Sequence, residues 1–185
     1  MSKHNKNTPY DLQLAEQYQA CHRASLFKRI GAYIYDLFLL GALLMLATLI
    51  ALIVVVITNK VGLIDLTLYQ DEGDYLGKNP LFLIYLCAVI ISFYSYFWVA
   101  AGQTIGMKAW RLRVQNSDGS NITFTQSLIR MATSLFGLGN VMSVLKDRNA
   151  FQDLWAECEV VVLTKELNNW KAIKGMAFMD SEKGK

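Results

Sequence analysis

Two stretches of 21 residues, 37–57 and 81–101, contain no charged side chain, and they constrain the fold more than any other feature. A helix of about 20 residues crosses a hydrocarbon layer about 30 Å thick, so each stretch is long enough to span a bilayer. In a soluble protein such helices would need covering by other elements, and a chain of 185 residues has few to spare. The sequence therefore predicts an α-helical integral membrane protein with two transmembrane helices, over about residues 30–57 and 81–101.

The composition excludes several other classes of protein. With 54% hydrophobic and 18% charged residues, the chain is too apolar for a disordered protein. Cys21, Cys87 and Cys158 are far apart and His4 and His22 form no cluster with them, so we expect no disulfide framework and no metal site. A formal charge of +3 without an aromatic–basic motif gives no reason to expect nucleic acid as a partner. No catalytic or phosphate-loop motif is present, so we expect a protein that is not an enzyme and has no cofactor.

The distribution of charge predicts an orientation in the membrane. Residues 1–36 carry five Lys/Arg, and residues 102–123 carry three against a single Asp. The connection 58–80 carries two Lys and four acidic residues. Since Lys and Arg accumulate on the cytoplasmic side, we expect a cytoplasmic N-terminus and an acidic outer loop. The first apolar run follows a long polar stretch and is too long for the core of a signal peptide, so we expect it to stay in the protein as a span.

A third apolar region, residues 124–145, is a poorer candidate for a span. Gln126 and Arg130 interrupt its first half, and Gly137-Leu-Gly-Asn140 breaks its middle. We predict a helix, a break and a second short helix that enters the membrane from the cytoplasmic side; a single crossing is the alternative. Irregular backbone at that depth must be packed against protein, because lipid offers no hydrogen bonds.

A small cytoplasmic β element is predicted between the second span and the third region. Trp110, Leu112 and Val114 alternate with polar residues, which is typical of a strand with one polar face. A turn over 116–120 and a return strand over 122–124 could follow, and the valine-rich residues 160–163 could add a further strand.

The two ends of the chain are expected to lie outside the membrane domain, which we place at residues 26–163. In residues 1–25, Leu14, Tyr18 and Cys21 recur with helical spacing, which favours an amphipathic helix on the inner leaflet; a frayed tail helix is the alternative. Residues 164–185 are a polar C-terminal tail.

Four charged residues in apolar surroundings are the candidate site. Asp36 directly precedes the uncharged run, and Arg29 lies two helical turns earlier, about 10 Å along the axis, so a tight pair between them is not expected. Arg130 lies in the third apolar region and Asp153 lies between aromatic and aliphatic residues. Because isolated charges are costly in such places, we predict one polar cluster of all four. The alternative is that they are ordinary interfacial charges.

Together these residues resemble the RDD family of small bacterial membrane proteins over about residues 26–163. The family's arginine, followed seven residues later by aspartate, matches Arg29 and Asp36, and its G-Q-T-x-G motif matches Gly102 to Gly106. Arg130 and Asp153 match its later arginine and aspartate, whereas the stretch Leu-Trp-Ala-Glu-Cys-Glu after Asp153 departs from the usual shorter link. The spacing of Gly102 and Gly106 alone is better explained by turn glycines than by a helix-dimer seam.

The resemblance implies a multi-pass protein of the bacterial inner membrane. Transport or cation/proton exchange, suggested for some members of the family, is the first hypothesis for its function. In that hypothesis the membrane-embedded carboxylates Asp36 and Asp153 bind the ion. The alternative is a non-transporting scaffold or accessory subunit in which the same charges are structural. Two spans cannot enclose a pathway, so we expect a homo-oligomer or a membrane partner protein in addition to the lipid bilayer.

Overall fold

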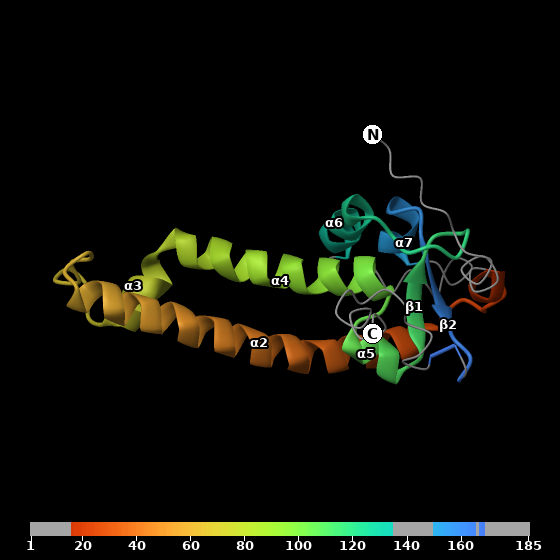
Figure 1. Cartoon of the computed structure of the whole chain (residues 1–185), viewed down its shortest axis with the longest axis horizontal. Helices are drawn as coiled ribbons and strands as arrows, with labels where there is room; N and C mark the ends of the chain where they lie inside the picture. Colours follow the sequence, from red (N-terminus) through yellow and green to blue (C-terminus); the bar gives the residue numbers. More distant parts are fainter. Residues whose placement is uncertain (1–15, 135–149, 166, 169–185) are drawn as a thin grey trace, which may run out of the picture. The chain divides into compact units, whose positions relative to one another are not determined.

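A computed structural model describes residues 16–134, 150–165 and 167–168. Figure 1 shows the order of the elements along the chain. They are α2 (Leu26–Lys60), α3 (Glu72–Lys78), α4 (Pro80–Ala101), α5 (Ile105–Ala109), β1 (Leu112–Gln115), α6 (Phe124–Thr133), α7 (Phe151–Trp155) and β2 (Glu159–Val162). The chain divides into two compact units. Residues 37–93 form the helical unit, and residues 1–36 with 94–185 form the sheet unit.

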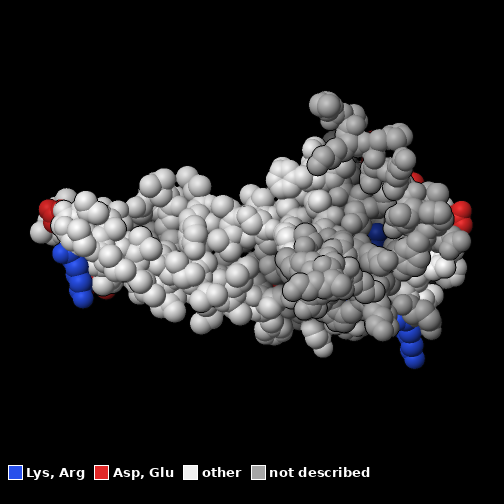
Figure 2. Space-filling model, viewed as in Figure 1, with Lys and Arg blue, Asp and Glu red and all other residues white. Residues whose placement is uncertain are grey.

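The two long helices confirm the prediction of two apolar helices that could span a membrane. Pro80 occupies the first position of α4, where its missing N–H costs nothing. Large apolar side chains along both helices face outward: Phe38 is 79% exposed, Met45 76% and Leu83 65%. A core helix of a soluble protein would bury these side chains, whereas a helix in lipid exposes them. On the face drawn in Figure 2, charged side chains of the helical unit appear only at its loop end, and the rest of its surface is white.

The loop of the helical unit contains the short helix α3. Asp71 caps this helix by accepting a hydrogen bond from the backbone N–H of Asp74, at 2.7 Å. The side chain of Asp74 in turn pairs with Lys78 at 2.8 Å, four residues on. These local bonds explain why an acidic, polar segment forms a compact turn between two apolar helices.

The sheet unit contains a two-stranded antiparallel sheet. Leu112 pairs with Val162 and Gln115 with Glu159, so the alternating strand and the valine-rich strand are both confirmed. The predicted return strand over 122–124 is wrong. Thr123 instead caps α6 in a capping box with Gln126, and this reciprocal pair of hydrogen bonds starts a helix at Phe124.

Both faces of β1 are buried, including the face that carries its polar side chains. Arg113 is only 8% exposed and Gln115 is fully covered. The cover is the N-terminal segment: the Arg113 guanidinium lies 3.8 Å from the centre of the Tyr18 ring, and Gln115 Nε2 donates to the Tyr18 carbonyl at 3.1 Å. A polar strand face can be buried because a segment 97 positions away supplies its partners.

Tyr18 of the N-terminal segment packs against the sheet unit, and contact of residues 1–25 with a leaflet stays a prediction. Tyr18 is 3% exposed and packs with Val161, Leu163 and Leu167. Leu14 lies outside the described residues. So does the part of the third apolar region beyond residue 134, and its break and second helix stay predictions.

The main apolar core lies on the other face of the sheet. It joins the first turns of α2 and the last turns of α4 to α5, both strands and α7. Its buried members are Ala24, Ala32, Trp98, Met107, Leu112, Val114, Ile122, Ala156, Cys158 and Val160. This core thus combines residues of α2, α4 and α5 with residues of both strands.

Candidate functional site

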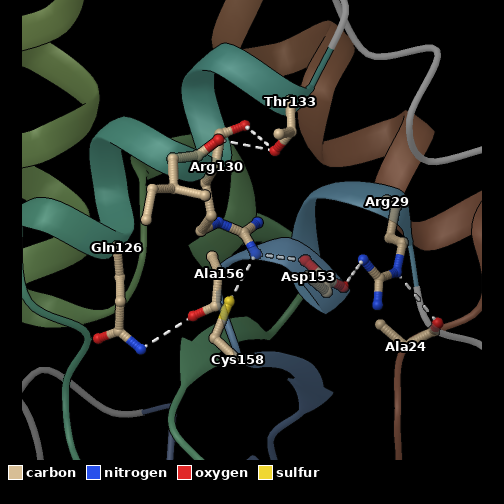
Figure 3. Close-up of polar contacts among 9 residues, drawn as sticks. Ala24, Arg29, Gln126, Arg130, Thr133, Asp153, Ala156 and Cys158 are labelled. Atoms are coloured by element: carbon tan, nitrogen blue, oxygen red, sulfur yellow. Dashed lines mark hydrogen bonds and ion pairs between the residues drawn. The ribbon is translucent and has the colours of Figure 1, made fainter.

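Asp153 is the centre of a buried ion-paired group. It lies in the first turn of the five-residue helix α7, and its side chain has no exposed surface. One carboxylate oxygen, Oδ2, accepts from Nη1 of Arg29 at 2.6 Å, and the other, Oδ1, accepts from Nη1 of Arg130. Figure 3 shows the carboxylate between the two guanidinium groups. We call Arg29, Arg130 and Asp153 the charge triad.

Arg130 reaches the triad from α6. Its Nη1 also donates to Cys158 Sγ at 3.1 Å, and its guanidinium lies 4.9 Å from the centre of the Trp98 ring. Burial alone would lower the pKa of Arg130, but the adjacent Asp153 carboxylate outweighs it and holds that pKa above its usual range. Arg130 therefore stays charged inside the sheet unit.

Arg29 reaches the triad from the first turn of α2. Its side chain is 3% exposed, and its Nε donates to the carbonyl of Ala24 at 3.3 Å, just before the helix starts. Two guanidinium groups and one carboxylate leave the triad with one excess positive charge. Burying these three charges is costly. Their mutual attraction offsets that cost only when the ion pairs have good geometry.

Asp36 lies outside the triad and contacts a different segment. Its Oδ2 accepts from Thr104 Oγ1 at 2.5 Å, and its Oδ1 accepts from the backbone N–H of Gly106 at 2.9 Å. The side chain is 3% exposed. In the part of the chain that the structure describes, Asp36 has no ion pair. The structure thus brings together three of the four predicted residues, whereas the fourth, Asp36 on α2, contacts α5 and its capping residue instead, so the predicted cluster of all four is wrong.

The close approach of α5 to Asp36 depends on Gly106. A Cβ atom built on Gly106 would overlap the carbonyl oxygen of Ala32 and lie 2.8 Å from Cγ of Asp36. Thr104 caps the same helix, because its Oγ1 accepts from the N–H of Met107 at 3.2 Å. One hydroxyl therefore both starts α5 and binds the carboxylate.

Gly102 has a separate role at the end of α4. Its φ of +65° lies in the left-handed region, and a Cβ there would approach the Val114 carbonyl to 2.7 Å. The N–H of Val114 donates to the Gly102 carbonyl at 2.7 Å, so the turn is tied to β1. Gly102 thus forms a turn, and Gly106 allows a contact between α2 and α5 within this chain.

Sequence reasoning missed Thr104 and Cys158 as members of this region. Thr104 could have been noticed as a capping residue within the motif Gly102-Gln-Thr-Ile-Gly106, but nothing near it indicates Asp36 as its partner. Cys158 follows Glu157, whose φ of +51° turns the chain from α7 into β2. This turn, in the stretch that departs from the family pattern, places the thiol against Arg130.

The described residues contain no group of three or more His, Cys, Asp or Glu side chains that could hold a metal ion. The charge triad has two cations on one carboxylate, which is a donor set that repels a metal cation. The Asp36 oxygens accept hydrogen bonds from two neutral donors, the Thr104 hydroxyl and the Gly106 N–H.

Comparison with known proteins identifies one relationship. A model described as the RDD family matches residues 23–157, which include the charge triad, Asp36 and both motif glycines. No curated protein matches, and no solved structure matches.

Proposed function

The chain belongs to the RDD family, and from this membership we propose that it is an ion-exchanging membrane protein in which Asp36 binds the proton or cation. The observation that carries the proposal is the environment of Asp36. It is a buried carboxylate at the edge of an uncharged span, and its donors, the Thr104 hydroxyl and the Gly106 N–H, are both neutral.

The chemistry of Thr104 supports a carboxyl group that changes its protonation state. A hydroxyl can donate to an ionised carboxylate or accept from a protonated one, so the same contact serves both states. Without a cation locked onto it, Asp36 can gain a proton without leaving an opposite charge stranded.

The triad is suited to a structural role. The Asp153 carboxylate binds both buried guanidinium groups, and without its charge they would lose the counter-charge that it supplies. We therefore propose that the ion-binding role falls on Asp36 and that Asp153, Arg29 and Arg130 hold α2, α6 and α7 together.

A non-transporting scaffold or accessory subunit is the second candidate. It is favoured by the fact that all four carboxylate oxygens of Asp36 and Asp153 already have a hydrogen-bond donor. Fully satisfied polar groups of this kind fix one packing arrangement without any further function.

The remaining parts of the proposal concern assembly and placement. We propose a homo-oligomer or a complex with a membrane partner, because two spans leave any pathway open to lipid. We place the protein in the bacterial inner membrane with a cytoplasmic N-terminus, on the charge asymmetry of the segments beside the spans.

Flux through proteoliposomes tests the proposal. Asp36→Asn should fold, because its amide oxygen can accept from Gly106 and its amide nitrogen can donate to Thr104. We expect wild type to show proton- or Na⁺-dependent flux and Asp36→Asn to lose it, with thermal unfolding unchanged. Asp74→Asn, in the exposed loop, is the control and should keep the flux. Wild-type flux equal to that of empty vesicles would support the scaffold instead.

A further inference from the structure

A cavity of about 460 Å³ opens in the sheet unit where α2 begins. Its polar lining includes His22, Arg23, Ser25, Lys28 and Thr164. These residues come from the segment before α2, from its first turn and from the chain after β2. The cavity is separate from the charge triad and from Asp36, and none of those residues lines it.

The cavity has an excess of positive charge. No Asp or Glu is among the described residues that line it. Arg23 forms an ion pair with Glu159, with 3.3 Å between Nε and Oε2, and the Arg23 side chain is 42% exposed. Lys28 is half-buried and has no ion pair within the described parts of the chain. A lysine, an arginine and two hydroxyl side chains that line one cavity suit an anion such as a phosphate ester.

An exposed apolar strip begins next to this cavity. Phe27, adjacent to Lys28, is 84% exposed, and Ile30 and Ile34 are 41% and 46% exposed. The spacing of three and then four residues places the three side chains on one face of α2. The cavity and the strip together offer a polar site for an anion and an apolar surface for a chain attached to it.

We propose that this cavity binds the headgroup of an anionic phospholipid. The phosphate contacts Lys28 and Arg23, with the hydroxyls of Ser25 and Thr164 as further donors, and the acyl chains lie along Phe27, Ile30 and Ile34. Free phosphate shares the headgroup chemistry but lacks the chains, so it gains nothing from the apolar strip.

Native mass spectrometry of delipidated protein in a mild detergent tests the proposal by titration. The three probes are phosphatidylglycerol, phosphatidylcholine and inorganic phosphate. We expect retention of phosphatidylglycerol at concentrations where the other two leave the protein unbound. Equal retention of phosphatidylcholine, or binding of phosphate at the same concentration as the lipid, would overturn the proposal.

Variants at two lysines of α2 distinguish lipid binding in this cavity from a general attraction between basic residues and an anionic lipid. Lys28→Gln should weaken binding of phosphatidylglycerol about fivefold, the effect of one basic residue at a membrane surface. Lys28→Arg should retain it. Lys60→Gln, at the opposite end of α2, is the matched control and should bind as wild type does. Equal weakening in the two glutamine variants, or no change in either, would contradict the proposal, and thermal unfolding without lipid checks that both variants fold.

Discussion

Arg29 and Asp153 lie 124 positions apart in the chain, and their side chains meet at 2.6 Å between Nη1 and Oδ2. The contact joins the first turn of the first long helix to a five-residue helix near the end of the described chain. Arg130 binds the other oxygen of the same carboxylate. One aspartate therefore connects three helices, α2, α6 and α7, that lie in separate parts of the sequence.

Replacing the shared carboxylate should be the most destabilising change in the triad. Asp153→Asn leaves two buried guanidinium groups with no counter-charge, and breaking a buried pair in this way costs about 3–5 kcal/mol. Arg29→Met leaves Arg130 and Asp153 as a neutral pair, so we expect a smaller loss. Thermal unfolding in detergent measures both.

Asp74→Asn is the control for this comparison, because Asp74 forms its ion pair on the surface of the loop. Its melting temperature should stay at the wild-type value. If Arg29→Met were the more destabilising of the two triad variants, the charge balance described for the triad would be wrong.

A methyl group at Gly106 should disturb the contact between α5 and Asp36. Gly106→Ala places its Cβ on the Ala32 carbonyl and beside the Asp36 carboxylate, so backbone has to move, at a cost of about 1–3 kcal/mol. Gly41→Ala, in the same long helix as Asp36, meets no atom within 4 Å and should be neutral or slightly stabilising. Equal melting temperatures for the two variants would show that the close approach does not exist.

Cys158 should react slowly with alkylating reagents in the folded protein. Burial raises the pKa of its thiol, although the Arg130 guanidinium acts in the opposite direction. The fold thus favours the protonated thiol, and this contribution to stability is present below the pKa of the unfolded thiol, about 8.5, and is lost as the pH rises further.

We therefore expect the free energy of unfolding to fall more steeply above about pH 8.5 in wild type than in Cys158→Ala. Comparing the two proteins removes the contribution of lysines and tyrosines that titrate in both. Alkylation followed by mass spectrometry measures the rate at which Cys158 reacts. Protein unfolded in detergent, in which the thiol is accessible, gives the reference rate. Rapid labelling of the folded protein at neutral pH would contradict the buried position.

Labelling of single cysteines checks the proposed orientation. Leu68 is 90% exposed in the loop of the helical unit, and Ser117 is exposed in the turn after β1. In a background without Cys21, Cys87 and Cys158, Leu68→Cys should react with an impermeant reagent in intact cells, whereas Ser117→Cys should react only after lysis. The reverse pattern would mean that the topology is inverted.

The elements that could be predicted are those determined by local composition. Uncharged runs define the two long helices, and β-branched or alternating residues define the two strands, because each pattern depends on neighbours in the chain. The triad residues could be singled out for a related reason: a charge inside an apolar segment needs a partner somewhere.

The identity of each partner could not be predicted, because it depends on how distant segments pack. Asp36 binds Thr104 and Gly106, about 70 positions away, and no pattern around Asp36 points to them. Likewise, Arg113 and Gln115 have the sequence signature of a solvated strand face. Only the fold reveals that Tyr18 covers them.

The position of Asp36, directly before the uncharged residues 37–57, has an electrical consequence. A full elementary charge that crosses the bilayer experiences about 2.3 kcal/mol per 100 mV, but a charge that stops at the edge of the hydrocarbon crosses little of that field. If Asp36 binds the ion as proposed, binding from the near side should therefore be almost independent of membrane voltage. In that proposal, any voltage dependence of flux would arise between Asp36 and the opposite surface, along the length of the apolar helices.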